Sequence, residues 1–355
     1  MRSEHVAIYV PALNRGGAER VAALLATGFF KAGRRTTLLV DFEASENRAL
    51  VASGIEIIVL GRSHAVATLA LARFLRRQRP DIVLAIGGAA DVKLAAAHLL
   101  TGSRIPIVLS YHGRSDVGRG RLGHASYTLA RRLSRRAAMV CVSDGLVDHL
   151  CNDWHVPRDR VTRIYNPVSV ERALTVSRDE LARRPPVVMS VGRLNREKDF
   201  AALIAALPSI QSDARLVIYG EGPERDALQA EAARLGVADR LHLAGYHDDP
   251  WPCYTTARCF ALTSPKEAFG NVVVEALASG LPVVATRSGG PDEILEHGRM
   301  GALVDNGDIP ALAAAINQAL ADPGDPSPRI AHAKTFDVDT AVANYLALFN
   351  KMLRR

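Results

Sequence analysis

The sequence predicts an α/β protein made of two Rossmann-like, doubly wound domains, each a parallel sheet with helices on both faces. Short, almost continuously apolar runs alternate with helical patterns along the chain, which is typical of parallel strands buried on both sides. The alternation starts again after segment 164–170. The 355 residues also exceed the length at which one core usually stops growing, ~250 to 300 residues. We therefore expect two domains, residues 1–166 and 167–339.

Each domain is expected to contain five or more strands in βα alternation. Strands of the first domain are predicted at 5–10, 34–42, 54–60, 81–86, 105–111 and 137–143, with helices near 18–32, 65–79, 91–101, 123–136 and 144–152. Strands of the second domain are predicted at 185–192, 214–220, 240–246, 258–264 and 281–286, with helices near 199–207, 223–235, 251–257, 271–279 and 308–321.

The last segment of the chain reads as an amphipathic helix over about 340–355, with an apolar stripe at Val342, Tyr345, Leu346, Phe349 and Met352. Ligands of doubly wound sheets bind beyond the carboxyl ends of the strands. We therefore expect an active site in a cleft between the two facing domains.

Charge is distributed unevenly along the chain. Residues 1–165 hold 24 Lys and Arg against 13 Asp and Glu, whereas the remainder holds 20 against 24. The densest basic stretches are 73–79 and 119–136, and the second spaces Leu122, Tyr127, Leu129 and Leu133 among its arginines. A cationic amphipathic helix of this kind suits an anionic membrane surface or a lipid-linked pyrophosphate. The alternative is a solvated arginine-rich helix.

Composition disfavours several other classes of protein. Aromatic residues are only 5% of the chain and no reading motif is present, so nucleic acid is an unexpected partner. The four cysteines lack C-x-x-C spacing, which favours free thiols in a reducing cytosol. Neither a signal peptide nor an apolar stretch of ~18 residues is visible. We expect a cytoplasmic protein, with peripheral association at the inner face of the membrane as a further expectation.

The stretch "SPKEAFGNVVVEALASGLPVVAT", residues 264–286, predicts an anion site flanked by two carboxylates. A loop with Glu267 follows a strand, and a helix begins at about Phe269 to Asn271. The first amide groups of a helix lack partners and attract anions, and Gly270 lets a phosphate approach the backbone. Glu275 lies one turn further along the helix. A nucleotide-sugar needs this layout: the diphosphate on the helix end, and carboxylates for ribose and sugar hydroxyls.

Other polar residues follow strands at the same predicted edges. Arg193 and Lys198, in "VGRLNREKD", can neutralise a leaving diphosphate without metal. Gly16 and Gly17 precede the first helix, and His112 follows another apolar strand. The turn before the first helix lacks the G-x-G-x-x-G fingerprint, so a dinucleotide site is disfavoured. The phosphate-binding motif G-x-x-x-x-G-K-[ST] is not present either.

Two further features concern a nucleobase and a metal. Main-chain groups near Tyr246 are placed to face a nucleobase edge. Asp337 and Asp339 form D-x-D, a spacing used elsewhere to hold a metal on a nucleotide diphosphate. Here this pair opens a helix, where Asp is favoured as a cap, so we expect no metal site and no cofactor.

Together these motifs resemble the retaining, metal-independent GT-B glycosyltransferases of family 4 (glycosyl transferases group 1). The resemblance rests on "GGAER", "VSDGL", "YNPV", "GRL…EK", "GEGPER" and "FGN…EALASGLPVVAT…GGPDEI", which occur in this order over nearly the whole chain. The chain departs from the pattern at Ala268, where Gly is usual, and at Asn271, where an aliphatic residue is common.

The resemblance implies a role for each matching residue. Arg193 and Lys198 would hold the diphosphate, Glu275 the ribose and Glu267 the donor sugar. Phosphate and sugar would also meet the amides of Phe269, Gly270, Asn271 and Val272. Gly16 and Gly17 would border the donor phosphate and the acceptor, and His112 would lie beside the transferred sugar. The resemblance also implies that the first domain binds the acceptor and the second the nucleotide-sugar, and that the terminal helix, about 340–355, crosses back to join the first domain.

The implied activity is retaining transfer from a nucleotide-sugar, commonly UDP-hexose or UDP-N-acetylhexosamine. The acceptor would be a hydroxyl of a glycan or lipid-linked acceptor in cell-surface polysaccharide or lipopolysaccharide synthesis. The alternatives are a nucleotide-sugar 2-epimerase and a non-catalytic nucleotide-sugar-binding protein.

Overall fold

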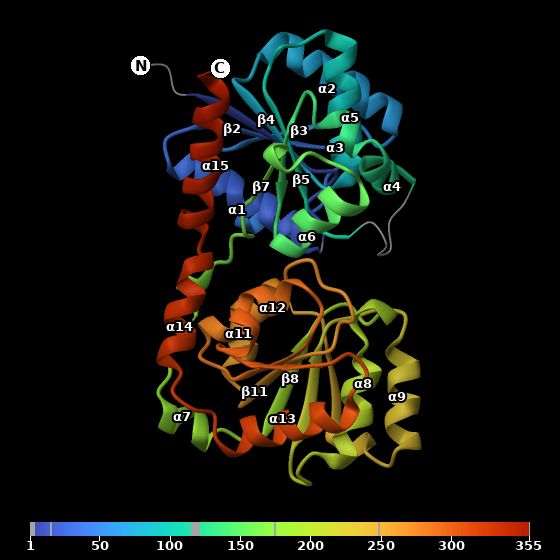
Figure 1. The fold of residues 1–355 in the computed structure, drawn as a ribbon, viewed down its shortest axis with the longest axis vertical. Coiled ribbons are helices and arrows are strands. Elements are labelled where there is room, and N and C mark those ends of the chain that lie inside the picture. The colour runs from blue at the N-terminus through green and yellow to red at the C-terminus, as the bar shows by residue number, and fades with distance from the viewer. Residues whose placement is uncertain (1–3, 15, 115–120, 174, 248, 355) are drawn as a thin grey trace. The chain divides into compact units, whose positions relative to one another are not determined.

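The chain folds into two compact units, seen in the computed structural model in Figure 1. The structure describes residues 4–14, 16–114, 121–173, 175–247 and 249–354. Unit 1 contains Met1–Val168 together with Val338–Arg355, and unit 2 contains Ser169–Asp337. The chain therefore leaves unit 1 once and returns to it with its last helix.

Unit 1 is built on a seven-stranded parallel sheet with the order β3-β2-β1-β4-β5-β6-β7. Its strands are β1 (His5–Tyr9), β2 (Arg35–Val40), β3 (Glu56–Val59), β4 (Ile82–Ile86), β5 (Ile107–Tyr111), β6 (Ala138–Cys141) and β7 (Val161–Arg163). The strands β1, β4 and β5 are buried at every position. Their apolar sequences are explained by helices on both faces of the sheet.

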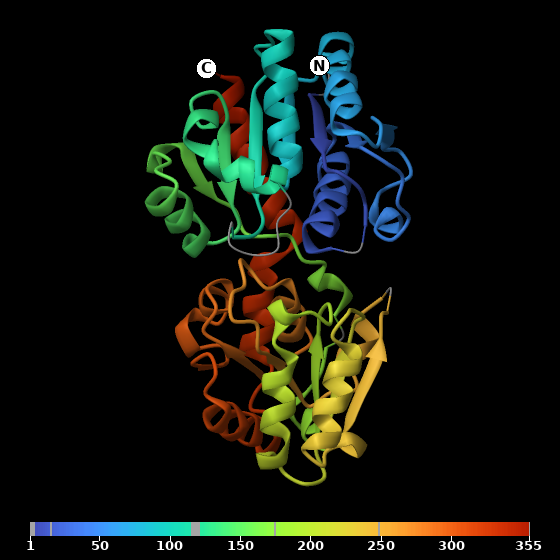
Figure 2. The ribbon, with the colours of Figure 1, turned by 90° about the vertical axis from the view of Figure 1, so that its right-hand side faces the viewer.

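The two faces of the unit 1 sheet carry different helices. The helices are α1 (Gly17–Lys31), α2 (His64–Gln78), α3 (Gly88–Thr101), α4 (Arg121–Thr128), α5 (Ala130–Leu133), α6 (Asp144–Asp148) and α15 (Val338–Leu353). One core joins α1 and α15 to the sheet, with Phe29 in ring contact with Tyr345 and Phe349. On the other side α2 packs against α3, and α3 against α4. Figure 2 shows α2 and α3 in front of the strands of the unit 1 sheet.

Unit 2 repeats the same strand order in a six-stranded parallel sheet, β10-β9-β8-β11-β12-β13. Its strands are β8 (Val187–Val191), β9 (Arg215–Tyr219), β10 (Leu241–Gly245), β11 (Cys259–Leu262), β12 (Val283–Thr286) and β13 (Ala302–Val304). The central strands β11 and β12 are buried throughout.

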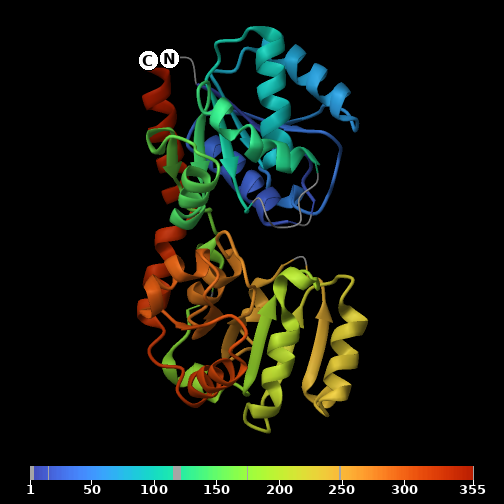
Figure 3. The same ribbon diagram turned by 45° about the vertical axis from the view of Figure 1, so that its right-hand side comes forward.

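The helices of unit 2 are α7 (Arg178–Arg183), α8 (Phe200–Ala206), α9 (Arg225–Arg234), α10 (Trp251–Tyr254), α11 (Asn271–Ala278), α12 (Gly290–Ile294), α13 (Ile309–Ala321) and α14 (Ser327–Ala333). One apolar core joins α8, α9 and α13 to the sheet. Figure 3 shows α8 and α9 lying along the strands. The helix α11 packs against β11, β12 and α14.

The structure confirms the predicted parallel α/β class and adds short elements to it. The edge strands β7 and β13 span three residues each and were not predicted. The single helix predicted at 123–136 is instead the pair α4 and α5, separated at Leu129.

Candidate active site

The strand order places most of the predicted site residues in loops at the carboxyl ends of the strands, near the point where the direction of the connections reverses. In each sheet the direction of the connections reverses between the first and fourth strand, β1 and β4 in unit 1 and β8 and β11 in unit 2. Ligands of doubly wound sheets bind beyond the carboxyl ends of the strands at this switch point. In unit 2 the loop after β8 carries Arg193 and Lys198, and the loop after β11 carries Glu267.

An ion pair joins these two loops of unit 2. The Lys198 ammonium lies 2.5 Å from Oε2 of Glu267, and both side chains are partly exposed. The hydroxyl of Thr263, just after β11, donates to the carbonyl oxygens of Lys198 (3.1 Å) and Asp199 (2.8 Å). The backbone of the Lys198 loop is thus fixed to the strand that leads to Glu267.

The loop after β12 holds the backbone of Glu267 from the other side. The Glu267 amide donates to the Ser288 carbonyl at 2.9 Å, and the Gly290 amide donates to the Glu267 carbonyl at 2.9 Å. A Cβ atom at Gly290 would lie 2.3 Å from Cα of Phe269. Only glycine permits this close backbone approach, which explains part of the "GGPDEI" motif.

The helix α11 begins where the sequence predicted an anion site. Gly270 precedes its first residue with φ +102°, a left-handed conformation that favours glycine, and no side chain caps this end among the described residues. Phe269 is buried, with its ring centroid 5.8 Å from that of Phe336. Asn271 and Val272 are partly exposed and form the first turn. The amides of this turn are oriented as those of an anion-binding helix terminus.

Glu275 is buried inside unit 2, with only 3% of its surface exposed. The Tyr254 hydroxyl of α10 donates to Oε2 of Glu275 at 2.7 Å. A buried carboxylate needs such donors, because an unsatisfied charge is costly in a protein interior. Tyr254 thus orients the second predicted carboxylate. No pattern in the sequence indicated it, because Tyr254 lies in a short helix 21 positions before Glu275.

The remaining predictions for unit 2 fall at separate places along the edge of the sheet. The Arg193 side chain is exposed and makes no ion pair or hydrogen bond within the described part of the chain. The turn at Gly222 packs on its loop, where a Cβ atom would lie 2.3 Å from the Leu194 carbonyl oxygen. Tyr246 follows the edge strand β10, two strands away from β8, and is 39% exposed.

In unit 1 the predicted residues follow β1 and β5. Gly16 precedes α1 in extended conformation, and Gly17 is the first residue of that helix. A Cβ atom at Gly16 would lie 2.1 Å from Oε2 of Glu19, so the Glu19 carboxylate lies over the start of its own helix. A carboxylate there is favourable, because helix N-termini carry partial positive charge.

His112 belongs to a short chain of polar side chains in unit 1. Its Nε2 atom lies 2.9 Å from Oγ of Ser110, and that hydroxyl lies 3.0 Å from the Tyr345 hydroxyl of α15. Burial raises the pKa of the Tyr345 hydroxyl above its ordinary value, so Tyr345 stays protonated. The sequence indicated His112 but not Ser110, and it indicated Tyr345 only as an apolar stripe residue.

The D-x-D pair lies at the start of α15. Asp337 ends a short 3₁₀ turn, and Asp339 stands in the first turn of the helix. Within the described residues, no group of three or more His, Cys, Asp or Glu side chains is arranged to bind a metal ion. None of the described helices is long and apolar enough to cross a membrane.

Solved structures share this architecture. HepE (Alr3699) of Anabaena, crystallised with UDP and glucose, superposes with a TM-score of 0.83 at 23% identity, over 97% of this chain and 99% of that chain. The lipopolysaccharide outer core galactosyltransferase WaaB superposes with a TM-score of 0.78 at 19% identity, over 98% and 99%. These similarities show the GT-B fold, with two Rossmann-like parallel-sheet domains.

The sequence comparisons define the family. Residues 15–172 match the model described as Glycosyltransferase Family 4, and residues 175–335 match Glycosyl transferases group 1. The lipopolysaccharide core biosynthesis glycosyltransferase LpsE of Rhizobium meliloti is 32% identical over 250 residues, 70% of this chain and 67% of that protein. The chain belongs to the family 4, group 1 glycosyltransferases.

A second relative is matched over a shorter region. It is the N-acetylgalactosamine-N,N'-diacetylbacillosaminyl-diphospho-undecaprenol 4-alpha-N-acetylgalactosaminyltransferase of Campylobacter jejuni, 30% identical over 164 residues. That alignment spans 46% of this chain and 45% of the relative.

Proposed function

We propose that the protein transfers a hexose or N-acetylhexosamine from a UDP-sugar, with retention at the anomeric carbon, to a hydroxyl of a glycan or lipid-linked acceptor. The pathway would be cell-surface polysaccharide or lipopolysaccharide synthesis. Support comes from the UDP and glucose found with HepE and from the lipopolysaccharide core assignment of LpsE. The diphospho-undecaprenol acceptor named for the Campylobacter relative supports a lipid-linked substrate.

The observation that carries the proposal is the Lys198–Glu267 ion pair beside the N-terminus of α11. An ammonium and a row of helix amides suit a diphosphate, and a carboxylate at the same point suits the hydroxyls of the attached sugar. Arg193, exposed on the same loop as Lys198, adds a second cation. These protein charges would take up the charge of the leaving nucleotide without a resident metal ion.

The other predicted residues complete the donor site. Glu275, oriented by Tyr254, would accept hydrogen bonds from the two ribose hydroxyls. Main-chain groups near Tyr246 would face the nucleobase. In unit 1, Gly16 and Gly17 would border the phosphate and acceptor, and His112 would lie beside the transferred sugar.

In the proposed reaction the bond between the anomeric carbon and the β-phosphate oxygen breaks first, through an oxocarbenium-like state. The acceptor hydroxyl then attacks from the same face of the sugar and passes its proton to the leaving phosphate. The configuration is retained, and no protein nucleophile is needed. The cations near the phosphate stabilise the charge that develops there, which is the kind of effect worth roughly 10² to 10³ in turnover for one well-placed donor.

A panel of nucleotide-sugars tests the proposal. A ligand that binds only the native state raises the unfolding temperature, so UDP-sugars should stabilise the protein more than GDP- or ADP-sugars. The donor found in this way is then incubated with lipid-linked and glycan acceptors, with and without EDTA, and the anomeric configuration of the product is read by NMR. Release of UDP only with acceptor, unaffected by EDTA, and a retained configuration are expected.

Three results would contradict the proposal. A rearranged sugar from donor alone would identify an epimerase, and donor binding without nucleotide release for any acceptor would identify a binding protein. An inverted product would exclude the retaining reaction.

A further inference from the structure

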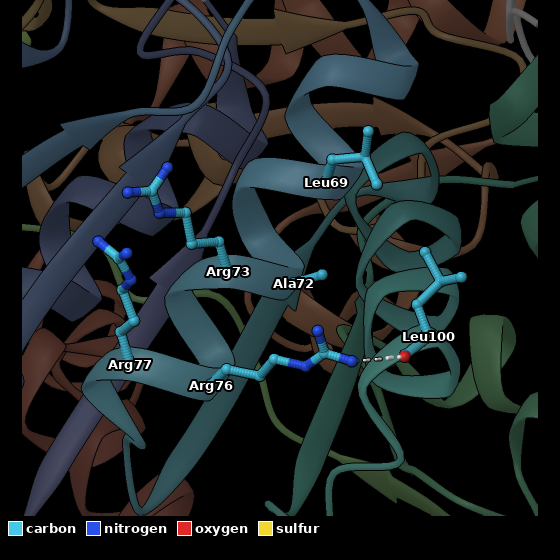
Figure 4. Close-up of a pocket in the computed structure, with 6 residues that line it drawn as sticks. All are labelled: Leu69, Ala72, Arg73, Arg76, Arg77 and Leu100. Atoms are coloured by element: carbon cyan, nitrogen blue, oxygen red, sulfur yellow. Dashed lines mark hydrogen bonds between the residues drawn. The ribbon is translucent and has the colours of Figure 1, made fainter.

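A hollow on the surface of unit 1 lies between α2 and α3, with a volume of about 470 Å³ (Figure 4). It is lined by Leu69, Ala72, Arg73, Arg76, Arg77 and Leu100, and we call this surface the α2–α3 face. It lies on the side of the sheet opposite α1 and α15. It is therefore separate from the core that carries the terminal helix.

Two lining residues of the α2–α3 face are large, exposed apolar side chains: Leu69 is 63% exposed and Leu100 58%. Leu99, which precedes Leu100 on α3, is 56% exposed. Val66, one turn before Leu69 on the same stripe of α2, is 54% exposed. These four make up half of the large hydrophobic side chains that are exposed among the described residues. Exposed apolar side chains that gather on one surface indicate an interaction site.

The same face is strongly basic. Arg73 and Arg77 make no ion pair or hydrogen bond through their side chains within the described part of the chain. Arg76 donates to the Leu100 carbonyl at 3.2 Å, at the end of α3 (Figure 4). The helix α2 contains no acidic residue, and the single acid of α3, Asp91, is buried. An anion that approaches these arginines therefore meets no carboxylate of either helix.

The second basic stretch of the sequence, 119–136, lacks exposed apolar groups in its described part. Tyr127 is 1% exposed and packs edge-on against Tyr111, while Leu122, Leu129 and Leu133 are partly buried. Its arginines therefore surround a stripe that faces inward, as in a solvated helix. The sequence pointed to 119–136 as the amphipathic stretch, but among the described residues of the two stretches it is the α2–α3 face that combines unpaired arginines with exposed leucines.

We propose that the α2–α3 face docks on a bilayer that contains anionic phospholipids. The arginines bind the lipid phosphates through paired N–H donors, and the leucines enter the boundary between headgroups and acyl chains. Free phosphate would satisfy the arginines but leave the leucines in water, so the combination favours a lipid surface. The inference rests on the proposed function only in that a lipid-linked acceptor requires the enzyme to work at a membrane.

Vesicle co-sedimentation tests the proposal with two double variants. Wild-type protein should bind vesicles of phosphatidylcholine mixed with phosphatidylglycerol, bind phosphatidylcholine alone weakly, and be released by salt. Arg73→Glu combined with Arg77→Glu should weaken binding about 30-fold or more, since each basic residue near an anionic surface is worth roughly 1 kcal/mol. Leu69→Ser combined with Leu100→Ser should weaken it about tenfold or more.

A matched control makes the same charge change elsewhere. Arg183→Glu combined with Arg234→Glu alters two exposed arginines of unit 2 and should leave vesicle binding close to that of wild type. A Leu100→Trp variant should also show fluorescence quenching by brominated phospholipids, because this position enters the lipid. Equal loss from the control pair, or wild-type binding by the leucine pair, overturns the proposal.

Two further measurements separate this inference from its alternatives. If the leucine pair changes the sedimentation coefficient from that of a dimer to that of a monomer, the face joins two copies of the chain and the lipid proposal fails. UDP release with a water-soluble acceptor is measured on every variant and should match wild type. If no variant, nor wild type, transfers sugar while the vesicle results hold, the docking surface stands and the proposed function fails.

Discussion

Unit 1 and unit 2 have the same strand order around their switch points, yet they place different chemistry at the equivalent edge. Unit 2 joins two loops by the Lys198–Glu267 ion pair and sets the start of α11 beside it. Unit 1 places glycines after β1 and a His112–Ser110–Tyr345 chain after β5, without an ion pair between these predicted residues.

The difference separates the contribution of the sheet topology from that of the loop residues. The topology fixes where side chains meet, because the carboxyl ends of neighbouring parallel strands lie at one edge. The loop residues then decide what meets there. The Lys198–Glu267 charges at the edge of unit 2 suit a phosphorylated donor, whereas the predicted residues of unit 1 place there an imidazole that is held by the buried hydroxyls of Ser110 and Tyr345. Four experiments test this division.

The largest effect is expected at the ion pair. Lys198→Ala and Glu267→Gln should each lower turnover by roughly 10² to 10³, because each removes a group proposed to stabilise the transition state. The two variants should differ in affinity: UDP without a sugar should bind less well to Lys198→Ala but normally to Glu267→Gln. Isothermal titration with UDP and with the intact donor measures both.

Arg196→Ala is the matched control for this loop. Its side chain is 91% exposed and lies 3.6 Å from Glu224, so turnover should stay near that of wild type. Wild-type turnover in Lys198→Ala, or an equal loss of turnover in Arg196→Ala, would contradict the proposal that the ion pair stabilises the transition state.

A pair of glycine substitutions compares the rigidity of the two edges. Gly290→Ala must push against the backbone of Phe269, whereas Gly16→Ala meets only the flexible carboxylate of Glu19. We expect Gly290→Ala to lower the free energy of unfolding by about 1 to 3 kcal/mol, and Gly16→Ala to change it by less. Urea unfolding measures the difference. Equal losses would show that the two edges are packed alike.

Two tyrosine-to-phenylalanine substitutions compare the buried hydrogen bonds. Tyr254→Phe leaves the Glu275 carboxylate without one donor and should cost about 1.5 to 3 kcal/mol of stability. Tyr345→Phe removes a bond between two neutral hydroxyls and should cost about 0.5 to 1.5 kcal/mol. Hydrogen exchange of amides in each unit assigns each loss to its own unit. A smaller loss in Tyr254→Phe than in Tyr345→Phe would contradict the greater strength expected for the hydrogen bond to Glu275.

A pH experiment tests a feature that both units share, a cysteine buried in a strand of the sheet. Burial raises the pKa of the Cys259 thiol in β11 to about 12, from 9.0. Below about pH 8 the thiol is protonated in both the folded and the unfolded chain. As pH rises further the unfolded thiol ionises first, so stability falls with pH, by about 1 kcal/mol between pH 8 and pH 10.

The variant Cys259→Ala should lose this part of the pH dependence, and urea unfolding at pH 8 and pH 10 measures it. Burial also raises the pKa of Cys141 in β6 of unit 1, so Cys141→Ala should act in the same direction. If the free energy of unfolding fell with pH in both variants as steeply as in wild type, the two thiols would not be shielded from water in the folded protein.

The parallel sheets, and the places of most candidate site residues after the strands, were predictable because they follow local rules. Continuous apolar runs identified the strands, and residues directly after them, such as Lys198 and Glu267, were expected at one edge. Glycine and proline marked the end of α11. The family resemblance added which carboxylate was expected to serve which hydroxyls.

The partners that orient these residues could not be predicted, because they come from distant parts of the sequence. Tyr345 lies 235 positions from Ser110, and Thr263 lies 65 positions from Lys198. The short strand β13 carries too little pattern to be recognised. The exposure of Leu99 and Leu100 was equally hidden, because an apolar residue in a helix is normally expected to face the core.

The return of α15 to unit 1 has a consequence for how the protein is made. A ribosome releases residues 1–168 long before Val338–Leu353, so Phe29 at first lacks the rings of Tyr345 and Phe349. Unit 2, in contrast, is one continuous segment and needs no residue from either end of the chain. A chain that stops before residue 338 therefore leaves that apolar surface of unit 1 open to aggregation.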